Sequence, residues 1–212
     1  MRKEQLKKIS SHYILLPTKG LQKWPVITVN KKGEIVSLKY GSLAYTEEPG
    51  TEMHPGVIIP AFYDLFVSEK EKCAPTSIQD TINHFIGGTI ELGATPTNKT
   101  VVLKSKVKIG DPINLTKEKE AQFLVRKSNN YKTPLFERIK SAALTGKEIN
   151  HINLINTAVA SVLKYRKKQE LSPLIEVGGR PGLLILKGAD LKNFKLKKET
   201  KVKWLVKPTF TT

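Results

Sequence analysis

The chain has 212 residues, of which 39% are hydrophobic and 7% aromatic, and its formal net charge is +17. This length allows one compact domain with a small addition, and it nearly excludes a full (β/α)₈ barrel, which typically needs about 250 residues. No apolar run approaches the roughly 20 residues that cross a bilayer, so we expect no transmembrane helix and no membrane association.

The first third of the sequence is typical of short strands joined by turns. Residues 12–16 and 25–29 favour strands, Asn30-Lys31-Lys32-Gly33 indicates a hairpin turn, and residues 34–38 return as a further strand. A polar connection over 46–53 then leads to an apolar run over 56–64, which predicts a buried strand. We therefore expect an antiparallel meander followed by one core strand.

The middle of the chain alternates between helical and strand patterns. Apolar spacing predicts helices near 78–86, 135–145 and 149–168, the first of them ended by Gly87-Gly88. Strands are expected at 89–92 and 100–109, and residues 111–133 are polar and weakly patterned. After Pro173 three further strands are predicted, at 174–177, 183–186 and 201–206, with a glycine-rich turn over 178–182.

Strands at both ends with helices between them indicate an α+β fold whose sheet system is assembled from both termini. The strands of this sheet system are expected within residues 1–56 and 172–212, and the predicted helices lie within residues 57–171. The glycine clusters at 87–88 and 178–182 lack the strand, spacing and helix of a phosphate-binding loop, so they are interpreted as turns.

Several of these segments together resemble metal-dependent amidohydrolases of the cytosine deaminase and chlorohydrolase type. The resemblance covers about half of the chain, in segments 9–15 with 28–36, 55–64, 149–164 and 174–190. It implies that residues 1–56 and 172–212 pair into a small β-sandwich domain beside a barrel, and that 55–64 leads into the first barrel strand. Residues 57–171 would then form a reduced α/β segment in place of the barrel. The residue pattern at that point determines the functional expectation.

In that family a His-x-His pair after the first barrel strand binds a catalytic divalent metal. Phe66 and Ser68 stand at the matching positions, and neither is an adequate ligand. The four histidines, His12, His54, His84 and His151, have no metal-ligand spacing and are interpreted as structural or surface residues. We therefore predict no metal site, no cofactor and no catalytic residue, and a barrel that is missing or collapsed.

Other candidate residues are weaker. Asp64 follows an apolar strand but has no partner for acid–base work, so a cap or loop anchor is the favoured interpretation. Trp24 and Trp204 could stack on nucleobases, although aromatic residues on short strands more often belong to a core. Cys73 is the single cysteine, which excludes an internal disulfide and fits a reducing compartment. With no recognisable signal peptide, the expected location is the cytoplasm.

The charge is uneven along the chain. Residues 1–98 hold 11 Lys and Arg against 10 Asp and Glu, whereas residues 99–212 hold 25 against 9. Only five of the 36 basic residues are arginines, the residue that sequence-specific readers favour. A lysine-rich second half could bind nucleic acid or another polyanion, or could be a solubility surface.

The leading hypothesis is a non-catalytic amidohydrolase-like protein with a binding or assembly role. Apolar surface that a full barrel would cover, on the flanks of residues 57–66, could support a homo-oligomer. One alternative is a lysine-rich nucleic-acid or polyanion-binding protein. A further alternative is a small enzyme with an unrecognised site.

Overall fold

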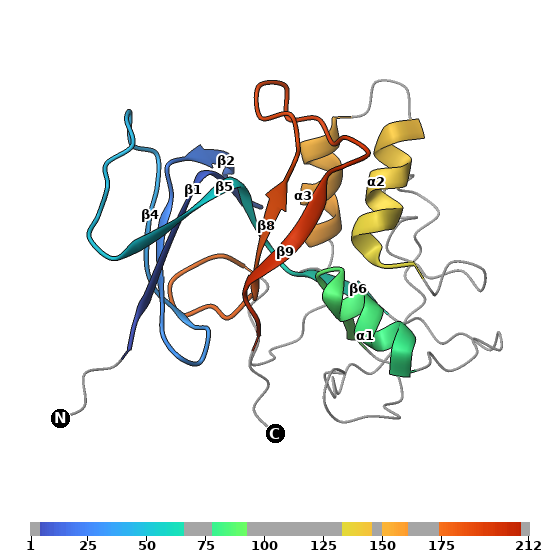
Figure 1. Cartoon of the computed structure of the whole chain (residues 1–212), viewed down its shortest axis with the longest axis horizontal. Coiled ribbons are helices and arrows are strands. Elements are labelled where there is room, and N and C mark those ends of the chain that lie inside the picture. The colour runs from blue at the N-terminus through green and yellow to red at the C-terminus, as the bar shows by residue number, and fades with distance from the viewer. Residues whose placement is uncertain (1–4, 66–77, 93–132, 146–149, 161–173, 209–212) are drawn as a thin grey trace. The chain divides into compact units, whose positions relative to one another are not determined.

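The structure is a computed structural model that describes residues 5–65, 78–92, 133–145, 150–160 and 174–208 (Figure 1). The chain divides into two compact units, one made of residues 1–61 and 170–212 and the other of residues 62–169. Within the described residues the fold is mixed α+β, most of its core is sheet, and no strands close into a barrel. No helix in these ranges is both long enough and apolar enough to cross a membrane.

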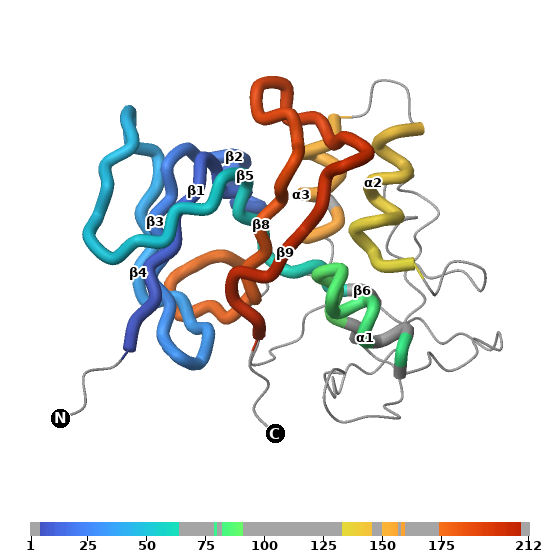
Figure 2. Tube along the Cα trace, viewed as in Figure 1, coloured from blue at the N-terminus to red at the C-terminus, as the bar shows by residue number. Residues whose placement is uncertain are grey.

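The first unit is a seven-stranded sheet whose strands come from both ends of the chain (Figure 2). Its order is β4-β3-β1-β5-β8-β9, with β2 also paired to β1. The strands are β1 (Lys7–Leu16), β2 (Gly20–Lys23), β3 (Val26–Val29), β4 (Ile35–Lys39), β5 (Thr51–Pro60), β8 (Leu183–Lys187) and β9 (Lys201–Val206). All neighbouring pairs are antiparallel except β1 with β5, which is parallel.

Strand β1 is long enough to hold two partners on one edge. Its first half pairs with β3, Ile9 lying opposite Ile27, and its second half pairs with β2, Ile14 lying opposite Gln22. The register of β1 against β5 shifts at this point, because Ser11 lies opposite His54 and Tyr13 opposite Val57. Strand β5 therefore carries the extra residue of a bulge. Strand β1 thus carries β2 and β3 on one edge and β5 on the other.

The sheet curls, so that its two ends approach each other. A Cβ atom on Gly33, in the β3–β4 turn, would lie 3.3 Å from Val206 Cγ1 at the end of β9. The core of this unit is a cluster of buried side chains from β1, β3, β4, β5 and β8, including Ile9, Ile27, Ile58 and Ile185. Leu205 and Val206 of β9 pack against the same cluster.

Residues 174–177, which we expected to form a strand, form a loop instead. The backbone of this region turns at Gly178, where φ is +84°. Ile35 N–H donates to Gly179 O at 2.9 Å, and Gly178 N–H donates to Ile35 O at 2.8 Å. The loop therefore covers the start of edge strand β4 without continuing as a strand.

The second unit contains a parallel strand pair and three helices. Strand β6 (Phe62–Leu65) pairs with β7 (Thr89–Leu92), and the helices are α1 (Ile78–Ile86), α2 (Leu135–Thr145) and α3 (His151–Ala160). Gly87 and Gly88 end α1, as expected, and Gly88 has a φ of +76°. The Phe62 and Phe136 rings stack with their centroids 5.9 Å apart, and both side chains are buried.

Helix α3 starts later than the predicted boundary near residue 149. Asn150 caps it, because the Asn150 Oδ1 atom accepts the Asn153 N–H at 3.0 Å. The predicted end of this helix at 168, the predicted strand at 100–109 and the segment 111–133 lie outside the described residues.

The apolar segment expected to offer an exposed patch is buried. Val57, Ile58, Ile59, Ala61, Phe62 and Tyr63 are each at most 3% exposed. The expectation of an exposed apolar face on 57–63 was therefore wrong. Val57 and Ile58 pair with both β1 and β8, Ile59 and Pro60 pair with β8, and Phe62 and Tyr63 belong to β6, which pairs with β7.

Candidate binding groove

A groove of about 470 Å³ opens in the first unit where several strand ends meet. The start of β1, the β3–β4 turn, the start of β5 and the end of β9 form its walls. The residues that line it are Gln5, Leu6, Lys7, Lys8, Val29, Asn30, Lys31, Gly33, Gly50, Glu52, Leu205, Val206 and Lys207. Both ends of the chain therefore contribute to one concave surface.

The charge of the groove is mainly positive. Lys7, Lys8, Lys31 and Lys207 line it, and Glu52 is the acidic residue among the lining side chains. Lys7 Nζ lies 3.1 Å from Glu52 Oε2. The hydrogen bond from Lys7 holds the pKa of Glu52 below the usual glutamate value, and a weaker hydrogen bond from His54 adds to the effect. This carboxylate is therefore ionised near neutral pH.

A second acidic residue lies beside the groove and is also paired. Glu48 accepts from Lys39 Nζ at 2.7 Å, and Lys8 Nζ lies 3.6 Å from its other oxygen. The hydrogen bond from Lys39 lowers the pKa of Glu48, and the charge of Lys8 adds to the effect. Each of these carboxylates is thus matched by a lysine, and lysines remain in excess along the groove.

The groove also has apolar walls. Leu6, Val29, Leu205 and Val206 line it, and Val29 is buried while Leu205 and Val206 are half-buried. Apolar walls with cations suit a ligand that carries an anionic group on an apolar body. A bare inorganic anion would leave the apolar walls unused.

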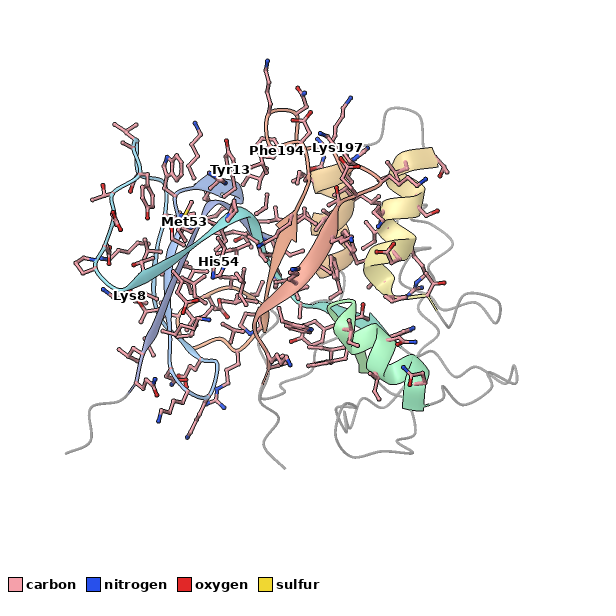
Figure 3. All side chains as sticks on the ribbon, viewed as in Figure 1. Lys8, Tyr13, Met53, His54, Phe194 and Lys197 are labelled. Atoms are coloured by element: carbon pink, nitrogen blue, oxygen red, sulfur yellow. The ribbon has the colours of Figure 1, made fainter. Side chains whose placement is uncertain are left out.

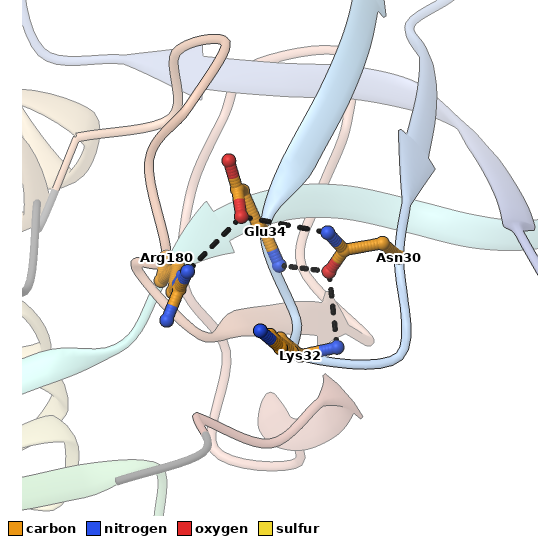
Figure 4. A network of polar contacts seen from close by, with 4 residues as sticks. All are labelled: Asn30, Lys32, Glu34 and Arg180. Atoms are coloured by element: carbon orange, nitrogen blue, oxygen red, sulfur yellow. Dashed lines mark hydrogen bonds and ion pairs between the residues drawn. The ribbon is translucent and has the colours of Figure 1, made fainter. Parts of the chain in front are cut away.

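A polar network fixes the turn on one side of the groove (Figure 4). Asn30 Oδ1 accepts the backbone N–H groups of Lys32 at 3.0 Å and Glu34 at 3.1 Å. Glu34 Oε2 in turn accepts from Arg180 Nη2 at 3.1 Å and from Asn30 Nδ2 at 3.4 Å. The network joins the β3–β4 hairpin to the loop that precedes β8. It holds the backbone of the turn that carries Lys31, one of the groove residues.

The residues matched to the amidohydrolase metal ligands, Phe66 and Ser68, lie outside the described residues, as does Cys73. Asp64 lies in β6, opposite Glu91 of β7. Among the residues that the structure describes, no three His, Cys, Asp or Glu side chains come together in a way that could hold a metal ion.

The histidines lie in separate elements. His12 Nδ1 accepts the Gly56 N–H at 3.2 Å, and its ring lies 5.7 Å from the Trp24 ring. His54 Nε2 lies 3.4 Å from Glu52 Oε2. His84 is fully buried within α1, and His151 is the first residue of α3. Each histidine thus has its own local environment.

Both tryptophans pack within the sheet unit. Trp24 has a left-handed backbone with φ of +50°, and its ring lies between His12 and Tyr45, 5.4 Å from the latter. Trp204 lies on β9 opposite Leu184, and its Cζ3 atom would be 3.0 Å from a Cβ on Gly182. Both are half-buried, so their rings are occupied by protein contacts over part of their surface.

Sequence reasoning did not find the groove. Its lysines come from three separated segments, and nothing in their spacing indicates that they meet. The doublets Lys7-Lys8 and Lys31-Lys32 were visible signals, but their relation depends on the pairing of β1 with β3.

No family model matches the chain, and no curated protein matches it. Solved structures similar to it include N-acetyl-D-glucosamine-6-phosphate deacetylase from Mycobacterium smegmatis, at 10% identity and a TM-score of 0.31, covering 42% of this chain and 24% of that one. The A. niger ochratoxinase matches at 12% identity, with a TM-score of 0.31 and coverage of 42% and 25%. A D-hydantoinase matches at 19%, with a TM-score of 0.28 and coverage of 45% and 22%.

The chain thus spans about a quarter of the length of these structures. They are amidohydrolase-superfamily enzymes, and the likeness is weak and partial.

Proposed function

We propose that the chain is a non-catalytic amidohydrolase-like protein that binds an anionic ligand with an apolar body in the groove of its sheet unit. In this proposal residues 1–56 and 172–212 are the composite β-sandwich of that family, and residues 57–171 are a reduced remnant of the barrel. The single cysteine fits a cytoplasmic location.

The groove is the observation that carries the binding role. It is built from both ends of the chain, its acidic neighbours are paired, and its lysines stand beside apolar walls. A cation next to a partly dehydrated apolar wall attracts an anion more strongly than an isolated surface lysine does, because water screens the charge less.

The absence of catalysis is supported by residue chemistry. Phe66 has no donor atom, and the neutral hydroxyl of Ser68 holds divalent metals poorly, although both stand where the resembled family has histidines. His12 lies on β1, where its Nδ1 atom accepts the Gly56 N–H and its ring contacts the ring of Trp24.

Metal content and hydrolysis test the first half of the proposal. The purified full chain should carry no stoichiometric zinc or iron by mass spectrometry of its metals. Any amide hydrolysis in the preparation should be unchanged by a chelator. One bound equivalent of metal with turnover that the chelator abolishes would contradict the non-catalytic assignment.

Binding of 8-anilinonaphthalene-1-sulfonate, a probe with one sulfonate on an apolar body, tests the groove. Its fluorescence should rise on binding to the folded protein, and the variant Lys31→Glu with Lys207→Glu should weaken binding about tenfold, or about 1.4 kcal/mol. The matched control, Lys19→Glu with Lys23→Glu, changes the net charge equally but lies off the groove. Equal weakening by both variants would contradict the proposal.

A further inference from the structure

The hairpin from β8 through β9 carries a concentration of positive charge. Of its residues, only Leu205, Val206 and Lys207 line the groove. Residues 187–207 contain two acidic residues, Asp190 and Glu199, and eight lysines, at positions 187, 192, 195, 197, 198, 201, 203 and 207. All of these lysines except Lys187 are exposed.

The loop between the two strands has a fixed backbone. Asp190 and Lys195 exchange two backbone hydrogen bonds, of 2.9 and 3.2 Å. Asp190 Oδ1 accepts the N–H groups of Lys192 and Asn193, and Oδ2 accepts Asn193 Nδ2 at 2.9 Å. Thr200 Oγ1 accepts the Lys197 N–H at 2.7 Å and donates to Gly188 O. Both ends of the loop are therefore held by its own polar groups.

Apolar contacts decide which way the loop faces. Phe194 lies beside Tyr13 of β1 (Figure 3) and packs edge-on against it, with ring centroids 5.0 Å apart. Leu196 is 3% exposed. These two inward side chains alternate with lysines along the loop. The exposed lysines of the loop are Lys192, Lys195, Lys197 and Lys198.

The four lysines of the loop outnumber its two carboxylates, Asp190 and Glu199, and Asp190 interacts with Lys197. The Asn193 side chain, with the N–H groups of Asn193 and Lys192, binds the Asp190 carboxylate and lowers its pKa. Among the described residues no ion pair within 4 Å joins Lys192, Lys195 or Lys198 to a carboxylate. The loop thus presents Lys192, Lys195 and Lys198 outside ion-pair distance of the described carboxylates, on a backbone that its own hydrogen bonds hold.

We call the exposed lysines of residues 187–207 the lysine face. We propose that the lysine face binds the phosphate backbone of duplex nucleic acid without sequence preference. Lysine is a point charge suited to phosphates, whereas base recognition favours the planar fork of arginine, which residues 187–207 lack. The inference does not depend on the proposed groove ligand.

The same surface argues against two other polyanions. No large hydrophobic side chain in residues 187–207 is exposed, so the face offers neither a stacking platform for unpaired bases nor an apolar anchor for a lipid surface. Duplexes also have the higher charge density, with one charge per about 1.7 Å of axis. We therefore expect duplex to bind more tightly than single strand.

Fluorescence anisotropy of the full chain with labelled 24-base-pair duplex DNA of two unrelated sequences tests the proposal. The two sequences should bind equally. Four phosphate contacts at a slope of about 0.9 each predict a loss of affinity of about 150-fold between 50 and 200 mM salt. The lysine-face variant, with glutamine at positions 192, 195, 197 and 198, should lose at least about 30-fold in affinity at 50 mM salt, together with most of the salt slope.

A matched variant separates this surface from the net charge of the molecule. It carries glutamine in place of four other lysines, at positions 19, 23, 32 and 39, none of which lines the groove, and should keep its affinity within about threefold. Circular dichroism should show that both variants are folded.

Three outcomes would overturn the proposal. They are equal loss of affinity in the two variants, tighter binding of the single strand than of the duplex, and binding to phosphatidylserine vesicles but not to duplex DNA. The groove proposal would survive each of them, because its test uses a small sulfonate and other residues.

Discussion

Among the glycines that the structure describes, Gly56 in β5 leaves the least room for a Cβ atom. Its φ is +138°, and a Cβ atom there would overlap Leu186 O and lie 3.1 Å from Ile185 Cδ1. Its N–H also donates to His12 Nδ1. The backbone of β5 therefore passes β8 too closely for any side chain at this position.

We predict that Gly56→Ala lowers the free energy of unfolding by about 3 kcal/mol, because backbone strain and overlap with a buried carbonyl act together. Urea unfolding followed by circular dichroism measures it. Gly50→Ala is the control, since Gly50 has a φ of +73° but no atom within 4 Å of its Cβ position, and it should cost about 1 kcal/mol. Equal costs for the two variants would show that the close approach is not sterically limiting.

Asp190 gives a prediction for acid conditions. Its pKa lies below the usual aspartate value, chiefly because of the hydrogen bond from the Asn193 side chain. A lowered pKa in the folded state means that the stabilisation is present at neutral pH and is lost as pH falls through that lowered pKa. Carboxyl NMR titration should find Asp190 titrating below free aspartate, and Asp190→Asn should remove this pH dependence from amide exchange at Lys192 and Asn193. An unshifted titration would contradict the assigned bonds.

At the scale of elements, the β3–β4 hairpin is tied to the loop before β8 by Arg180 and Glu34. Both side chains are about 70% buried, and Asn30 orients the carboxylate from the other side. A double-mutant cycle with Arg180→Met and Glu34→Gln should give a coupling energy of about 0.5 to 1 kcal/mol in urea unfolding. A coupling near zero would mean that the contact does not join the two ends of the chain energetically.

Elements with a local signal were predicted well. The turn at Asn30–Gly33 is confirmed, because Asn30 and glycine dictate it without help from distant residues, and Gly33 N–H donates to Asn30 O. Strand β2 (Gly20–Lys23) was missed, since its four residues show no apolar alternation and its pairing with β1 comes from the chain reversal after Leu16. The strand expected at 174–177 does not form, because the chain turns there: Glu176 N–H donates to Leu174 O, Gly179 N–H donates to Glu176 O, and Gly178 has a φ of +84°.

The groove could not be predicted for a related reason. Lys7, Lys31 and Lys207 meet only once β1 has paired with β3 and the sheet has curled far enough to bring Gly33 next to Val206. Both events depend on long-range contacts, which periodicity within a short window does not report. The lysine face of 187–207, by contrast, is one continuous segment and was visible as part of the basic second half of the sequence.

At the scale of the molecule, the sheet unit requires both ends of the chain. Strand β5 is paired with β1 on one edge, as far as Ile58, and with β8 on the other edge over Val57–Pro60. Since β8 follows more than 120 residues later, the sheet must close a long loop before it gains these contacts, which predicts slow folding. Until β8 arrives, an apolar strand edge is open to pairing with other chains.

Truncation tests this dependence. A chain ending at residue 169 lacks β8 and β9, so the Ile58 and Ile59 edge of β5 is left unpaired and its side chains lose Leu184 and Ile185 as neighbours. We expect it to aggregate at micromolar concentration and to lose cooperative urea unfolding, because an apolar edge strand is a template for intermolecular pairing. A chain ending at Pro208 keeps both strands and should unfold as the full chain does. Cooperative unfolding of the shorter chain with an undiminished denaturant slope would show that the N-terminal strands form the sheet core without the C-terminal ones.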